Sequence, residues 1–156
     1  DNFIEENPQI DTERIYIGGC SAGGYMTVNM MIHYSDFFAA AFPICEAFPD
    51  NRISDSDMKK LSQKPLWFTV SLDDETINPQ KNTLPTVERL KNLGAPELHY
   101  VYYEHVTDTT GQYKNEKGDG PFMYDGHYSW VYVLNNQVED KGLKLFEWLS
   151  RQRNCN

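Results

Sequence analysis

The chain has 156 residues, and its 23 acidic and 14 basic side chains give a formal net charge of −9 at pH 7. This length suits one domain with a sizeable core, and a hydrophobic fraction of 40% is that of a folded protein. The acidic balance argues against a nucleic-acid partner, whose phosphates require clustered lysine and arginine. No apolar run approaches the roughly 20 residues that a membrane span needs.

Short strands and amphipathic helices alternate along the chain. A polar lead-in over residues 4–8 precedes a β-branched strand over 14–18 that runs into glycines. Helical spacing follows over 25–34, and the continuous apolar run over 37–45 is typical of a strand buried on both faces. A short helix is predicted over 54–61, with Ser54 or Asp55 as its cap.

The second half of the chain repeats this alternation. A strand over 66–72 ends in an acidic turn, and a helix over 84–93 is stopped by Gly94 and Pro96 before a strand over 98–103. Residues 106–126 read as a long loop, and a last helix carries Leu143, Phe146 and Leu149. Four strands alternating with helices predict an α/β fold with a largely parallel sheet.

The sharpest motif is Gly19-Cys20-Ser21-Ala22-Gly23, which satisfies Gly-x-Ser-x-Gly between a predicted strand and helix. An abrupt strand-to-helix reversal strains the residue at its apex and needs small neighbours two positions to either side. Ser21 is then held at the carboxyl end of the sheet, where the helix N-terminus favours developing negative charge. A dinucleotide fingerprint would need glycine in place of Cys20, and a phosphate-binding loop would need lysine where Tyr25 stands.

A nucleophilic serine needs a base and a carboxylate that orients the base, and in α/β hydrolases these follow in the order Ser, acid, His. Asp73 and Asp74 both follow the strand over 66–72 directly, so both are candidates for the acid. The aromatic side chains in and beside the end of the long loop form either a wall for an acyl group or ordinary packing. These aromatic residues are Tyr113, Phe122, Tyr124, Tyr128 and Trp130.

Four histidines are candidates for the base. His33 precedes the acid, so the chain order excludes it, and His99 within a strand is expected to be structural. His105, at the end of that strand, is a weak candidate. His127, which follows the long loop and precedes a helical stretch, is the preferred base.

Residues 11–27 and 37–45 resemble the elbow region of α/β-hydrolase esterases. The resemblance is to the group shared by polyhydroxybutyrate-depolymerase-like and feruloyl-type esterases and prolyl-oligopeptidase-like hydrolases. The family's Asp-x-x-Val/Ile before a proline turn is matched by Asp74-Glu-Thr-Ile77-Asn-Pro79, which selects Asp74 over Asp73. His127-Tyr-Ser-Trp130 is similar to the family's His-x-Ser-Trp.

This resemblance implies a three-layer α/β/α hydrolase fold with a mostly parallel sheet. It also implies a triad of Ser21, Asp74 and His127 that cleaves a small-molecule or polymer-linked carboxylic ester through an acyl-enzyme. The backbone N–H of Ala22 is the expected oxyanion donor. A prolyl-oligopeptidase-like peptidase with the same triad and a catalytically silent binding module are the alternatives.

The family domain has several strands before the elbow, and a loop after one of them donates half of the oxyanion hole. Because this chain opens almost directly on the elbow strand, we expect residues 1–156 to be the carboxyl-terminal portion of one hydrolase domain. The missing N-terminal portion is then its expected partner, and an edge of the sheet should be exposed.

The three cysteines show no zinc-site spacing, and we expect no metal and no cofactor. Cys20 and Cys45 each follow a strand signal, so they either lie close enough to pair or are two free thiols. Cys155 is the odd third cysteine.

Overall fold

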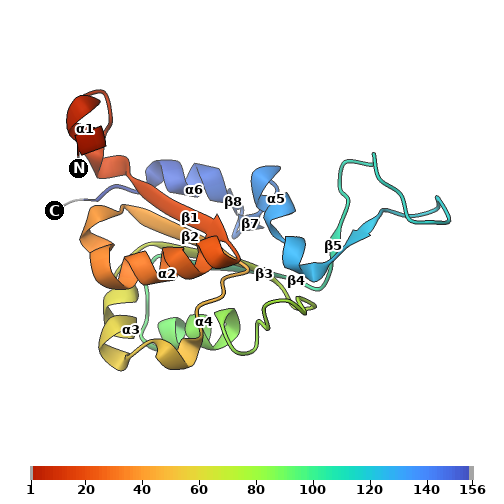
Figure 1. Cartoon of the computed structure of the whole chain (residues 1–156), viewed down its shortest axis with the longest axis horizontal. Coiled ribbons are helices and arrows are strands. Elements are labelled where there is room, and N and C mark those ends of the chain that lie inside the picture. Colours follow the sequence, from red (N-terminus) through yellow and green to blue (C-terminus); the bar gives the residue numbers. More distant parts are fainter. Residues whose placement is uncertain (1, 155–156) are drawn as a thin grey trace.

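The computed structural model describes residues 2–154, which form a parallel sheet with helices on both faces (Figure 1). The four strands of this sheet stand in chain order: β1 (Tyr16–Cys20), β2 (Ala40–Ile44), β3 (Leu66–Ser71) and β4 (Leu98–Tyr103). All three neighbouring pairs are parallel, so their carboxyl ends meet at one edge of the sheet. The predicted α/β fold with a parallel sheet is confirmed.

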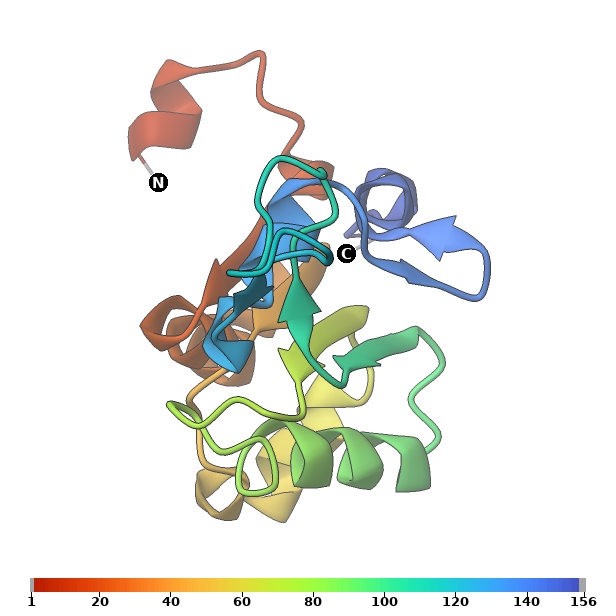
Figure 2. The same ribbon diagram turned by 90° about the vertical axis from the view of Figure 1, so that its right-hand side faces the viewer.

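Helices cover the two faces of this sheet separately, as Figure 2 shows from the side. One face is covered by α2 (Ala22–Tyr34), α3 (Asp55–Leu61) and α4 (Thr83–Asn92). The other face is covered by α5 (Trp130–Leu134) and α6 (Leu145–Arg151). Each face has its own buried cluster, around Phe68 on the first and around Trp67 on the second. Adjacent residues of β3 thus point into different cores, which makes the three-layer α/β/α arrangement.

The remaining elements are short. They are α1 (Asn2–Glu6), four single turns of 3-10 helix (Thr12–Arg14, Ser35–Phe37, Asp50–Arg52 and Gly126–Tyr128) and the paired strands β5 (Val106–Thr107) with β6 (Met123–Tyr124) and β7 (Glu139–Asp140) with β8 (Leu143–Lys144). The polar lead-in at the start of the chain is therefore partly helical, although α1 has no buried residue.

The predicted long loop is closed at its base by a hairpin. Val106 is fully buried and pairs with Tyr124, and Thr107 pairs with Met123. The segment between them projects from the body of the molecule (Figure 1). Two-residue strands are too short to leave a periodic signal in the sequence, so this pairing depends on the tertiary burial of Val106.

The buried face of the last helix differs from the predicted one. Leu143 lies in β8, before the helix, and Phe146 is 40% exposed. The buried residues of α6 are Leu145, Trp148 and Leu149, so Leu149 alone of the predicted set is confirmed. Trp148 contacts Trp67 with ring centroids 5.4 Å apart, so a tryptophan pair in the core fixes the helix orientation.

His99 has the structural role that its position in a strand predicts. Its ring stacks on Trp67 with centroids 4.5 Å apart, and its Nδ1 lies 2.8 Å from Asp140 Oδ2. The histidine thereby connects β4 to the β7–β8 hairpin.

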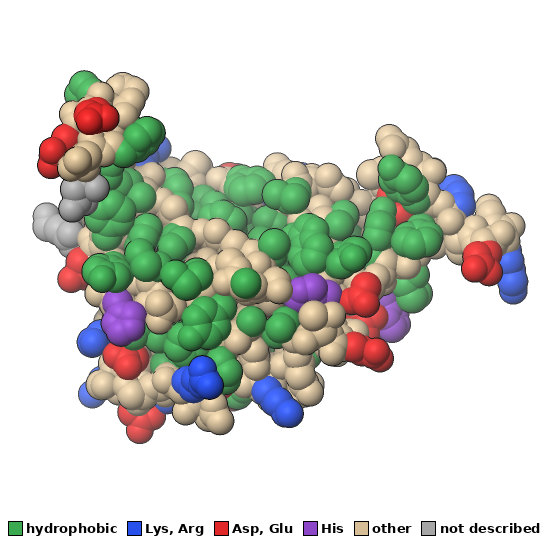
Figure 3. Space-filling model, viewed as in Figure 1, with side chains coloured by type: hydrophobic (Ala, Val, Ile, Leu, Met, Phe, Trp, Pro, Cys, Tyr) green, Lys and Arg blue, Asp and Glu red, His purple; other side chains and the backbone are tan. Residues whose placement is uncertain are grey.

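β1 stands at one end of the sheet and pairs with β2 as its single neighbour among the described strands. Figure 3 shows hydrophobic side chains gathered in a band between the α1 end of the molecule and the projecting hairpin. No helix within residues 2–154 is both long enough and apolar enough to cross a membrane.

Candidate active site

The turn from β1 into α2 holds Ser21 in a conformation that L-residues rarely adopt. Its φ is 57° and its ψ is −116°, and it is the N-cap residue of α2. The Ser21 backbone N–H donates to the Ile44 carbonyl at 3.0 Å, which connects the apex of the turn to the end of β2. This is the backbone strain expected of a sharp strand-to-helix reversal.

Two glycines near this turn are crowded by neighbouring backbone, and only one of them belongs to the Gly-x-Ser-x-Gly motif. A Cβ on Gly19 would lie 2.8 Å from the carbonyl carbon of Gly23, so the position two residues before the serine must be small. A Cβ on Gly23 would meet nothing within 4 Å, whereas one on Gly24 would lie 2.7 Å from Glu46 Cα. The close approach that requires glycine in the helix is therefore at Gly24, where α2 contacts the chain after β2.

This difference predicts opposite effects for two neighbouring substitutions. Gly23→Ala should stabilise the fold by up to about 1 kcal/mol, because alanine is the better helix former. Gly24→Ala should instead destabilise it by roughly 1–3 kcal/mol, because the new methyl group overlaps backbone that cannot rotate away. Urea denaturation of the two variants measures both effects. Equal stability of the two variants would contradict the close approach at Gly24.

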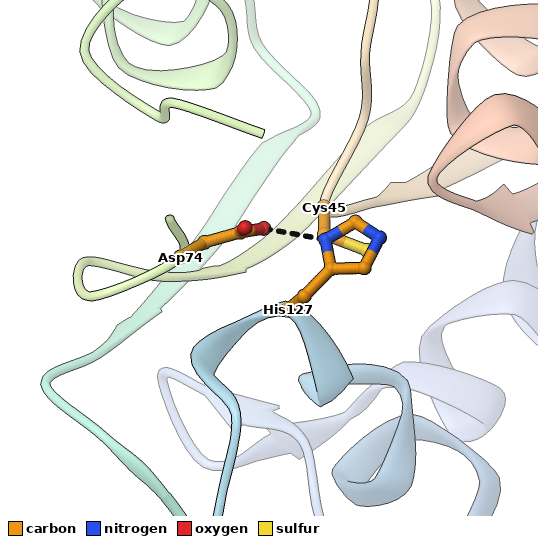
Figure 4. A group of neighbouring side chains, drawn as sticks. All are labelled: Cys45, Asp74 and His127. Atoms are coloured by element: carbon orange, nitrogen blue, oxygen red, sulfur yellow. Dashed lines mark hydrogen bonds and ion pairs between the residues drawn. The ribbon is translucent and has the colours of Figure 1, made fainter. Parts of the chain in front are cut away.

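Asp74 and His127 form a buried pair at the carboxyl edge of the sheet (Figure 4). His127 Nδ1 lies 2.8 Å from Asp74 Oδ2, and the residues are 8% and 4% exposed. The other carboxylate oxygen of Asp74 accepts hydrogen bonds from the backbone N–H groups of Thr76 and Ile77, at 2.9 and 2.8 Å. Asp74 is therefore fixed by its own turn, and its remaining oxygen faces the imidazole.

Three contacts hold His127 in place. The backbone of Gly126 lies against Asp73, since a Cβ on Gly126 would come within 2.7 Å of the Asp73 carbonyl carbon. Asp125 accepts a hydrogen bond from the His127 backbone N–H at 2.8 Å, which fixes the backbone of the base. The Trp130 ring meets the imidazole edge to face, with centroids 5.3 Å apart.

Asp73 contacts a different histidine. Its Oδ2 lies 2.7 Å from His105 Nδ1, and its Oδ1 accepts a hydrogen bond from Ser71 Oγ. Partial burial opposes ionisation of Asp73, but the contacts with Ser71 and His105 prevail and lower its pKa. The two adjacent carboxylates thus have separate partners, and His105 is exposed whereas His127 is buried.

Cys45 also belongs to this region, although no sequence motif points to it. Cys45 directly follows β2, is fully buried and has a φ of 35°. Its sulfur, a ring nitrogen of His127 and a carboxylate oxygen of Asp74 all lie within 4.8 Å of one another. Figure 4 shows the sulfur beside the imidazole ring. The available signal was its position at the end of a parallel strand, at the same sheet edge as Ser21 and Asp74.

The environment of Cys45 keeps its thiol protonated. Burial raises the pKa of Cys45 to about 12, while the adjacent Ser21 backbone N–H acts in the opposite direction. The Cys45 thiol thus adjoins both the Ser21 backbone N–H and the Asp74–His127 pair. Cys20 and Cys45 are both free thiols, so they do not form a disulfide with each other. Cys155 lies outside the described residues.

Ser21 is placed at the same end of the sheet as this pair, but its hydroxyl is not bonded to it. Among residues 2–154, no hydrogen bond joins Ser21 Oγ to His127. The backbone N–H of Ala22 belongs to the first turn of α2, so it has no acceptor within the helix.

Glu46 follows Cys45 and is a buried acid, 1% exposed. Its Oε2 accepts a hydrogen bond from the Phe48 backbone N–H at 2.6 Å, and its Oε1 accepts one from Thr83 Oγ1 at 3.3 Å. Burial outweighs these contacts and raises the pKa of Glu46 from 4.5 to about 8. The carboxyl connects the chain after β2 to the start of α4.

This raised pKa predicts that Glu46→Gln removes a pH dependence of stability. The stabilisation linked to Glu46 is fully present below about pH 4.5 and is lost as pH rises through about 8. Glutamine does not titrate, so the variant should not lose this stabilisation as the pH rises. Its free energy of unfolding, relative to that of the wild type, should therefore increase by on the order of 3 kcal/mol over this range. Urea denaturation at pH 5 and pH 9 measures the gain, with the exposed Glu116→Gln as control. Parallel pH dependence of wild type and Glu46→Gln would contradict the burial argument.

Comparisons with known proteins agree with this fold. A thermostable esterase of known crystal structure is 28% identical, and the alignment covers 97% of this chain and 34% of the esterase with a TM-score of 0.71. The uncomplexed acylaminoacyl peptidase of Pyrococcus horikoshii is 20% identical over 95% of this chain and 28% of its own, with a TM-score of 0.58. A ferulic acid esterase is 15% identical over 65% of this chain and 49% of its own, with a TM-score of 0.51.

The chain thus spans about a third of the length of the thermostable esterase. No curated protein sequence matches it. Residues 1–83, which contain the strained serine turn and Asp74, match the sequence profile of the prolyl oligopeptidase family. This match covers more than half of the chain, and the fold is the α/β-hydrolase fold of the similar structures. The chain therefore belongs to the prolyl oligopeptidase family.

Proposed function

We propose that the chain carries the catalytic triad of a serine hydrolase that cleaves carboxylic esters through an acyl-enzyme on Ser21. The observation that supports this most directly is the buried, hydrogen-bonded pair of Asp74 and His127 at 2.8 Å. Ser21 lies on a strained turn at the same sheet edge, next to Cys45, whose sulfur is within 4.8 Å of the pair. In this proposal the nucleophile comes from the turn after β1, the carboxylate from the turn after β3 and the base from the turn before α5.

In the proposed reaction, His127 Nε2 takes the proton from Ser21 Oγ as the oxygen attacks the ester carbonyl carbon. The same nitrogen then gives this proton to the leaving alcohol, and a water molecule activated by His127 hydrolyses the acyl-enzyme. Asp74 keeps the proton of the neutral imidazole on Nδ1 and stabilises the imidazolium. The Ala22 N–H donates to the oxyanion, and the dipole of α2 favours the same charge.

The similarity to the thermostable esterase favours an ester as the substrate, because it extends over 97% of this chain. Tyr128 and Trp130 add an aromatic surface beside the base, with ring centroids 4.7 Å apart. Tyr128 is 44% exposed and so is available to a ligand. We therefore propose a small-molecule or polymer-linked ester with a hydrophobic acyl or aromatic group.

A peptidase is the second candidate, because the family profile that matches residues 1–83 is that of prolyl oligopeptidase. Both reactions use the same triad, so the leaving group decides between them. The test compares turnover of an activated ester with that of a peptide anilide that has proline before the scissile bond. Faster ester turnover that disappears in Ser21→Ala supports the esterase, and faster anilide turnover supports the peptidase. Turnover of neither substrate would favour a catalytically silent module.

A further inference from the structure

The carboxyl edge of the sheet brings together three side chains that commonly bind transition metals. Cys45, Asp74 and His127 are at most 8% exposed, and one ligand atom from each lies within 4.8 Å of the other two. They come from the end of β2, the turn after β3 and the turn before α5, so no sequence spacing reveals the group. Thiolate, imidazole and carboxylate are also the ligand types found in zinc sites.

A fourth polar atom lies beside this group without a partner. Ser129 is fully buried, and its Oγ makes no hydrogen bond to any described residue. Ser129 Oγ adjoins the Cys45 thiol but does not meet the geometry of a hydrogen bond with it. A buried hydroxyl without a partner is costly, and a metal ion or a metal-bound water would satisfy it.

The charges of the group select the kind of cation. With the Cys45 thiol deprotonated, Cys45 and Asp74 carry two negative charges and a neutral His127 carries none, so a divalent ion makes the buried site neutral. Sulfur and nitrogen ligands favour Zn²⁺ or Co²⁺ over Mg²⁺ and Ca²⁺, which prefer oxygen ligands. Zinc–ligand distances of about 2.0–2.3 Å require the three ligand atoms to move closer together, which side-chain rotation can achieve.

We propose that Cys45, Asp74 and His127 form a binding site for a thiophilic divalent cation of the Zn²⁺ type, which inhibits the hydrolase by occupying its base. Binding releases the proton of the Cys45 thiol into solvent, and the single proton of the neutral His127 imidazole moves from Nδ1 to Nε2, so that the cation takes its place between Nδ1 and Asp74 Oδ2. Because Nε2 then carries the imidazole proton, this nitrogen cannot accept the proton of Ser21. The inhibition rests on the proposed function, whereas the binding does not.

Titration of the complete chain with Co²⁺ tests the binding directly, because a cobalt–thiolate bond gives an absorbance that oxygen and nitrogen ligands do not. We expect this absorbance to saturate at one equivalent and to be abolished by one equivalent of Zn²⁺ but not by Mg²⁺. Cys45→Ser should lose the absorbance, and its affinity for Zn²⁺ should fall by more than about 100-fold. This loss exceeds the one expected from removing a residue that only hydrogen-bonds to a metal ligand. Cys20→Ser, the exposed thiol one residue from Ser21, is the matched control and should retain both.

A second variant keeps the test decisive if Cys45→Ser does not fold. His127→Gln retains the thiol, so it should keep the cobalt–thiolate absorbance but weaken Zn²⁺ binding. Absence of the absorbance in the wild type, its loss in Cys20→Ser, or unchanged Zn²⁺ affinity in His127→Gln would overturn the proposal. Ser21→Ala should bind Co²⁺ like the wild type, so failure of the hydrolase assignment leaves this result unchanged. Labelling of Ser21 by a phosphonate should be blocked by Zn²⁺ and restored by a chelator.

Discussion

Ser21→Ala is expected to lower kcat for ester hydrolysis by about six orders of magnitude, to the level of the reaction without the enzyme's nucleophile. The reason is that Ser21 alone is held at the apex of the strained turn, with a φ of 57°, beside the Asp74–His127 pair. Steady-state turnover of an activated ester measures the effect. His127→Ala should cost about as much, because serine without its base is a weak nucleophile.

The double variant Ser21→Ala/His127→Ala separates a triad from two independent effects. In the proposed mechanism the two residues act as one unit, so the double variant should be no slower than either single variant. The two losses should multiply if the residues act separately, and that result would contradict the mechanism. Retention of more than a tenth of wild-type kcat in Ser21→Ala would contradict the assignment of the nucleophile.

Asp74→Asn is expected to lower kcat by about four orders of magnitude while leaving the fold intact. The carboxylate oxygen that faces Thr76 and Ile77 accepts two backbone N–H groups, so an asparagine oxygen takes that position. Its NH₂ group then faces His127 Nδ1 and donates to it, which places the imidazole proton on Nε2. In this tautomer His127 cannot accept the proton of Ser21. Turnover of the same ester at neutral pH measures the loss.

Asp73→Asn is the matched control, because the two aspartates are adjacent and follow the same strand. Asp73 contacts Ser71 and His105 and not His127, so the change should alter kcat by no more than about twofold to threefold, equivalent to ~0.5 kcal/mol. If Asp73→Asn were the damaging change and Asp74→Asn the mild one, the acid would be Asp73 and the assignment made here would be wrong.

Much of the sheet could be predicted because its two central strands, β2 and β3, are buried on both faces. The strand predicted over residues 98–103 coincides with β4, and β3 has no exposed residue. The Ser54 cap of α3 is also confirmed, since its hydroxyl accepts the Asp57 backbone N–H at 3.1 Å. These features follow from local composition and capping chemistry, which the sequence records directly.

Features that depend on tertiary contacts were not predictable in this way. The β5–β6 hairpin forms because Val106 is buried by distant residues, and α6 is oriented by contact between Trp148 and Trp67. The order of short motifs indicated Asp74 and His127, but it contained no indication of Cys45 beside them.

The most direct test of the central claim is the intact mass of the chain after treatment with an organophosphonate that phosphonylates activated serines. Wild type is expected to gain one adduct and Ser21→Ala none, with Cys20→Ser labelled like the wild type to exclude a reaction at the neighbouring thiol. One adduct that disappears with Ser21 means that this serine is activated by the Asp74–His127 pair. No adduct on the wild type, or an adduct that persists in Ser21→Ala, would contradict the triad.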